Sequence, residues 1–66
     1  MIMKANIIQD NTVKYTTSFT DTTDTFYCLA WAHRMGYDVI EVSSTMAKLE
    51  TVEGNEAILD ISFVDH

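Results

Sequence analysis

The sequence is short of residues that cross-link or interrupt small proteins: it has one cysteine, two glycines and no proline. Because the single cysteine, Cys28, cannot form an intrachain disulfide, the chain falls outside the disulfide-rich secreted class, and a reducing compartment is favoured. The cysteine and the two histidines do not have the spacing of a metal site, and no glycine-rich phosphate loop is present. We therefore expect neither a metal nor a cofactor.

Long apolar runs are also absent. A helix that spans a membrane needs about 20 consecutive apolar residues. The N-terminal segment MIMKANII lacks the long apolar region and the cleavage site of a signal peptide. These features predict a cytoplasmic protein without a membrane partner.

Basic residues are scarce, and the acidic ones are unevenly distributed. The formal net charge is −6. Residues 1–37 contain three acidic and three basic residues, whereas residues 38–66 contain seven acidic residues and one base, Lys48. Such a charge repels nucleic acid and attracts basic surfaces, so direct nucleic-acid binding is not expected. A simpler interpretation is that surface acids keep a small protein soluble.

The length of 66 residues predicts a single domain, residues 1–66. A chain this short buries only about 60% of the surface that its unfolded form exposes, so its stability is marginal. Small domains usually add disulfides, a metal or a partner. With the first two excluded, good packing or self-association remains.

Alternating apolar and polar residues predict strands over most of the chain. The expected strands are residues 3–9, 12–19, 38–43, 46–52 and 57–64. The first two form a hairpin across Asp10 and Asn11. Val13, Tyr15, Thr17 and Phe19 fall on one face of the second strand. Helix-favouring residues leave a short helix open as an alternative for the fourth strand.

One helix is expected within residues 22–36 (TTDTFYCLAWAHRMG). The N-cap is Asp21, Thr22 or Thr23, and Gly36 suits the left-handed position that ends a helix, with a hydrophobic contact from Tyr37. The element order is then ββαβββ. It predicts an α+β domain in which an antiparallel sheet carries one helix across a face.

This helix is apolar on nearly all sides, which a short chain cannot bury completely. We expect a ridge of Tyr27, Trp31 and Arg34 to face outward, because Tyr, Trp and Arg are enriched among interface hot spots. The residues expected against the sheet are Phe26, Cys28, Leu29 and Ala32. In the competing interpretation the helix is rotated and Trp31 belongs to the core.

No group of residues has the pattern of a catalytic site. Cys28 and His33 are five residues apart, so on a helix they diverge by about 140° and do not form a nucleophile–base pair. The carboxylates of Glu41, Glu50 and Asp60 could work as an acid–base pair only in a particular strand register. A chain of this length also leaves little room for a ligand cavity of about 300 Å³ or more. We expect that the protein is not an enzyme.

The features favour a non-enzymatic binder of a partner with a basic surface. A small acidic domain of this kind can occupy the nucleic-acid channel of an enzyme as a nucleic-acid mimic. The small size and acidic composition therefore suggest an inhibitor from a phage or mobile element. The residues predicted to contact the partner are Tyr27, Trp31, Arg34, Glu41, Glu50, Glu53, Glu56 and Asp60. The alternative is a homo-oligomeric structural or accessory protein, for example a homodimer, that uses its helix face or an edge strand for self-association.

Overall fold

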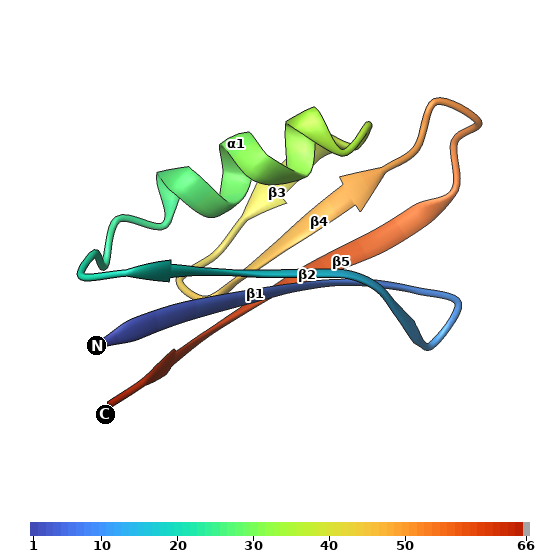
Figure 1. Cartoon of the computed structure of the whole chain (residues 1–66). Helices are drawn as coiled ribbons and strands as arrows, with labels where there is room; N and C mark the ends of the chain where they lie inside the picture. Colours follow the sequence, from blue (N-terminus) through green and yellow to red (C-terminus); the bar gives the residue numbers. More distant parts are fainter. Residues whose placement is uncertain (66) are drawn as a thin grey trace.

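The chain forms a five-stranded antiparallel sheet with one helix across a face, in a computed structural model that describes residues 1–65 (Figure 1). The elements in chain order are β1 (Ile2–Gln9), β2 (Thr12–Thr20), α1 (Phe26–Arg34), β3 (Asp38–Val42), β4 (Met46–Glu50) and β5 (Glu56–Val64). The predicted ββαβββ order and α+β class are confirmed, and the segment for which a short helix was open is strand β4.

The order of strands across the sheet is β2-β1-β5-β4-β3. Every neighbouring pair is antiparallel. The helix therefore connects the two edge strands, β2 and β3, in the chain, and it packs toward β3. β1 and β5 occupy the centre and bring the two ends of the chain close together, since Ile2 pairs with Val64 (Figure 1).

The β1–β2 hairpin turns at Asp10 and Asn11, whose φ angles of 56° and 59° are left-handed. Asn and Asp tolerate this conformation better than other residues with a side chain. The register then shifts, because Ile8 pairs with Val13 whereas Ile7 pairs with Tyr15. Val13 consequently lies on the opposite face from Tyr15, and the prediction that they share a face is wrong. The cause is a bulge that a period-two pattern does not reveal.

The helix begins later than the sequence predicts. Its N-cap is Thr25, and the Asp24 side chain accepts a hydrogen bond from the Phe26 N–H at 3.0 Å. Two residues before Asp24, the Thr22 hydroxyl oxygen accepts a hydrogen bond from the Asp24 N–H at 3.1 Å. The run of Thr and Asp thus forms two successive turns before the helix instead of one cap.

The end of the helix follows the prediction. Gly36 has a φ of +98°, and its N–H donates to the His33 carbonyl at 3.0 Å. The Tyr37 N–H donates to the Ala32 carbonyl at 3.2 Å, which completes a Schellman motif. Tyr37 is buried, and its hydroxyl donates to Gln9 Oε1 at 2.9 Å. This hydrogen bond ties the end of the helix to β1.

The core lies between the helix and the face of the sheet that it covers. Along β4 and β5 buried and exposed residues alternate, as expected when one face of a sheet is covered and the other is not. The buried residues are Met3, Ala5, Ile7, Cys28, Trp31, Ala32, Tyr37, Ala47, Leu49, Ala57, Leu59 and Ile61. Within residues 1–65, none of the buried residues is charged. On the opposite side of the sheet, which we call the open face, no helix or strand of residues 1–65 is packed.

Candidate functional site

The helix does not present the predicted ridge. Its buried residues are Cys28, Trp31 and Ala32, and Trp31 is only 9% exposed. These positions share one side of a helix, so the helix is rotated to place the indole in the core. Tyr27 and Arg34 remain exposed. The expectation that Trp31 faces outward is therefore wrong, and the competing interpretation is right.

The rotation also exposes a residue that was expected in the core. Phe26 is 67% exposed, whereas Leu29 is partly buried against the core. The helix has a nearly continuous apolar surface, so the position of its apolar residues alone does not fix which side faces the sheet. Packing of the large indole decides it, because Trp buries more apolar area than Phe.

Four of the five predicted acidic contact residues lie together on the open face. They are Glu41, Glu50, Glu56 and Asp60. Glu50, Glu56 and Asp60 are each next to a buried residue in their strand, so their side chains point away from the helix. Glu41 pairs with Lys48, which lies between two buried residues of β4, and therefore points the same way. The fifth, Glu53, lies in the turn between β4 and β5 and is separate from this group.

Three carboxylates form a row across adjacent strands of the open face. Asp38 of β3 pairs with Glu50 of β4, and Glu50 pairs with Glu56 of β5. Side chains directly opposite one another in an antiparallel pair have Cβ atoms about 4.5–5.5 Å apart. Like charges at this separation destabilise the sheet. We call Asp38, Glu50 and Glu56 the acidic row.

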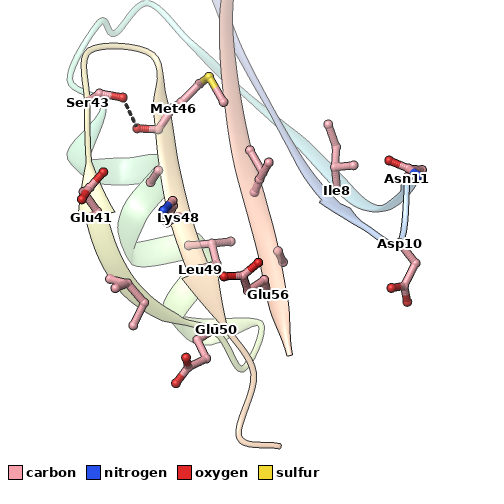
Figure 2. Close-up of a pocket in the computed structure, with 14 residues that line it drawn as sticks. Ile8, Asp10, Asn11, Glu41, Ser43, Met46, Lys48, Leu49, Glu50 and Glu56 are labelled. Carbon is pink, nitrogen blue, oxygen red and sulfur yellow. Dashed lines mark hydrogen bonds between the residues drawn. The ribbon is translucent and has the colours of Figure 1, made fainter. Parts of the chain in front are cut away.

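A second row of the open face has two apolar residues followed by two charged ones. Ile8, Ile58, Lys48 and Glu41 pair successively across β1, β5, β4 and β3. Lys48 is thus the one base between this apolar part and the acids (Figure 2). Ile58 is 41% exposed, which is high for a large apolar side chain in a central strand.

The residues of the two rows, apart from Asp38, line an open hollow of about 530 Å³, whereas Asp38 lines a second depression with Arg34 and Val39. The hollow extends from the hairpin tip, Asp10 and Asn11, to Glu41 and Ser43 on the β3 side (Figure 2). A space of this size exceeds what we expected of so short a chain. Its volume is within the range of small-ligand pockets, about 300–1,000 Å³, but it lies partly open on the surface of the sheet.

The sequence pattern missed Asp38 and the apolar residues of the open face. Asp38 was assigned to the start of a strand, and only the β3–β4 register places it opposite Glu50. Exposed apolar residues also border the hollow, namely Ile40, Met46 and Ile58. The available signal was the mixed second face of residues 57–64, where Ile58 stands among polar residues.

Cys28 and His33, the residues considered as a nucleophile and its base, lie on different sides of the helix. Cys28 is fully buried, and this burial raises the pKa of its thiol above the ordinary value of 9.0. A thiolate is the reactive form, so a raised pKa makes this cysteine a poor nucleophile at neutral pH. His33 is exposed on another side of the helix. The arrangement does not create a thiolate–imidazole pair.

Across residues 1–65, no three or more His, Cys, Asp and Glu side chains are placed so that they could hold a metal ion. Among the same residues no helix is long and apolar enough to cross a membrane. The chain matches no protein-family model, no curated protein and no solved structure. The open face with its hollow is therefore the candidate site.

Proposed function

We propose that this protein is a non-enzymatic binding domain whose open face engages a basic surface of another protein. The observation that carries the proposal is the acidic row, in which Asp38, Glu50 and Glu56 lie directly opposite one another on adjacent strands. Such a row costs stability in the free protein. A partner that places Lys or Arg against the row removes this cost and gains charge-assisted hydrogen bonds.

The apolar residues beside the row support a contact surface over simple solubility. Charges that only maintain solubility are spread over a surface, with both signs mixed. Here carboxylates border exposed Ile40, Met46 and Ile58 and half-buried Ile8 on a single face. An apolar centre with a polar rim is the usual anatomy of a protein–protein interface.

The partner that best fits is a protein that itself binds nucleic acid. Such proteins have basic grooves that are built to hold closely spaced phosphates. A row of carboxylates on a rigid sheet presents closely spaced negative charge in a similar way. In this proposal the protein acts in the cytoplasm as a nucleic-acid mimic of the kind a phage or mobile element uses to inhibit a host enzyme. Association would then be fast and sensitive to salt.

The alternative, self-association through the helix, has less support. The twofold surface that we expected included Trp31, which is buried in the core. Tyr27 and Arg34 are exposed, but they lie on the helix side of the molecule, away from the acidic row. Both remain candidates for a second contact with a partner.

Two variants with the same net charge test the proposal. The face variant carries Glu41→Gln, Glu50→Gln and Glu56→Gln. The control variant carries Asp21→Asn, Asp24→Asn and Asp65→Asn, which are exposed positions outside the open face. Tagged forms of both variants and of the original chain are used to capture proteins from host lysate. Each captured protein is then purified and its affinity is measured at several salt concentrations, with and without duplex DNA.

We expect the original chain and the control variant to bind the same basic protein, with DNA competing for it and affinity falling as salt rises. The face variant should bind at least tenfold more weakly, because it lacks the charges that meet the basic groove. Equal binding by the two variants would show that net charge and not the open face is responsible. A captured protein that DNA does not displace would contradict nucleic-acid mimicry.

A further inference from the structure

The two edges of the sheet differ in how they are protected against pairing with another strand. An edge strand presents unpaired N–H and C=O groups, and proteins usually protect it with short length, charged side chains or a bulge. β3 has all three protections. It is five residues long, carries Asp38 and Glu41, and shifts register against β4 between Val39 and Glu41.

β2 lacks these protections over most of its length. It has nine residues, and both its bulge and its one charged residue, Lys14, lie near the hairpin turn. From Tyr15 to Thr20 each residue pairs with β1 in continuous register, and none is charged. This part of β2, residues 15–20 (YTTSFT), is rich in aromatic and β-branched residues that favour strands. We call it the open edge.

Aromatic side chains of the open edge are incompletely covered on the helix side. Tyr15 is 42% exposed, and Phe19 is only partly buried. The ring centre of Phe19 lies 5.8 Å from that of Tyr27, which is 52% exposed. The helix packs toward β3 at the opposite edge of the sheet (Figure 1), so these rings are covered only in part, Phe19 by Tyr27 and Tyr15 by Tyr37, whose ring centre is 6.2 Å away.

We propose that two copies of this chain pair antiparallel through the open edge and form one continuous sheet across a twofold axis. A register centred on Thr17 places Tyr15 opposite Phe19 of the partner subunit and Thr16 opposite Ser18 of the partner subunit. Aromatic pairs and Thr–Ser pairs are among the favourable cross-strand combinations. The open edge is thus complementary to itself, as a twofold interface requires.

The charge distribution favours a second copy at this edge and not at β3. Residues 1–37 carry equal numbers of acidic and basic residues, so joining two open edges brings together neutral surfaces. Joining two β3 edges would oppose Asp38 and Glu41 with their copies. Because β2 and β3 are at opposite edges, pairing through β2 keeps the two acidic rows far apart.

This pairing also covers the exposed rings. A twofold axis perpendicular to the sheet places both helices on the same side of the joined sheet. Tyr15 and Phe19 of each copy then lie beside those of the other and lose contact with water, which contributes hydrophobic stabilisation. This contact is independent of the acidic row, which lies on β3, β4 and β5.

Sedimentation velocity over a concentration series, from low to several hundred micromolar, tests the pairing. The original chain should change from a monomer to a dimer within this concentration range. The double variant Thr16→Lys, Ser18→Lys places like charges opposite each other twice in the dimer. It should weaken dimerisation by about tenfold or more. Far-ultraviolet circular dichroism checks that each variant is folded.

A charge exchange makes the test specific for β2. The double variant Thr16→Glu, Ser18→Glu should also be monomeric, but an equimolar mixture of the Lys and Glu variants should form a heterodimer. Ile40→Lys on β3 is the matched edge control and should leave dimerisation unchanged. If the original chain stays monomeric at every concentration, the proposal is wrong. The occupant of the open edge would then be an extended strand from another protein. Loss of the dimer with Ile40→Lys, or its persistence in both charged β2 variants, also overturns the proposal.

Discussion

The two faces of the sheet are built from alternate residues of the same strands, yet they differ in burial and in charge. On the helix side, β4 and β5 contribute Ala47, Leu49, Ala57, Leu59 and Ile61, all of them buried. On the open face the intervening positions carry Lys48, Glu50, Glu56, Ile58 and Asp60. One face is arranged for packing, and the other has like charges directly opposite each other.

This difference separates the residues that hold the fold together from those available for binding. A one-residue step along a strand moves a side chain from the core to the open face. Substitutions on the two faces should therefore act on different properties. Those on the helix side should change stability, and those on the open face should change binding with little loss of stability.

The largest expected effect comes from Leu59, which is fully buried. Leu59→Ala removes apolar contacts and leaves a cavity, and it should lower the free energy of unfolding by about 2–5 kcal/mol. The core of so small a domain rarely supplies more than about 3–5 kcal/mol, so this variant should be largely unfolded. Urea titration followed by circular dichroism measures the change.

Ile58→Ala is the matched control on the adjacent residue. Ile58 points to the open face and is 41% exposed, so its truncation should cost less than about 1 kcal/mol. Similar losses for the two variants would contradict the contrast between the faces. They would indicate that something covers the open face in solution.

A smaller effect on the free energy of unfolding is expected at alkaline pH, and it arises from residues buried on the helix side of the sheet. Burial raises the pKa of the Cys28 thiol above its ordinary 9.0, and burial and the nearby Tyr15 raise the pKa of Tyr37 above 10.0. As pH rises, these groups lose their protons first in the unfolded chain. The stabilisation from the neutral Cys28 thiol is complete below about pH 9 and is lost as pH rises toward the pKa in the fold.

The free energy of unfolding should thus fall above pH 9, by at most about 1.4 kcal/mol per pH unit for one proton. Urea titrations at several pH values measure this slope. Cys28→Ala removes the thiol and should move the start of the decline toward pH 10, where Tyr37 begins to contribute. An unchanged pH dependence in this variant would contradict the assignment to Cys28.

The element order and most strand positions could be predicted from the sequence, because alternation and turn residues are local signals. The end of the helix is an example, since Gly36 and Tyr37 form the expected motif. The rotation of the helix could not be predicted, because apolar residues surround it. Trp31 and Phe26 exchange their expected places, and only packing against the sheet distinguishes them.

The candidate site depends on register, which is not a local property. The acidic residues themselves could be identified from the charge distribution along the chain. Their arrangement required two pieces of information that the pattern lacks: the strand order and the pairing of Glu50 with both Asp38 and Glu56. Bulges add to the difficulty, because each one shifts which face a side chain occupies, as at Val13.

The smallest effect follows from the cost of the acidic row. Glu50 lies between two carboxylates, so Glu50→Gln removes two unfavourable cross-strand pairs. We expect the free energy of unfolding to rise by about 0.2–1 kcal/mol, while binding to a basic partner weakens. Glu53→Gln makes the same change of charge in the turn, away from the row, and should stabilise the protein less. Urea titration at low salt compares the two variants. Equal stabilisation by both would mean that overall net charge, and not the row, is responsible, whereas an excess at Glu50 that disappears at high salt would locate the repulsion in the row.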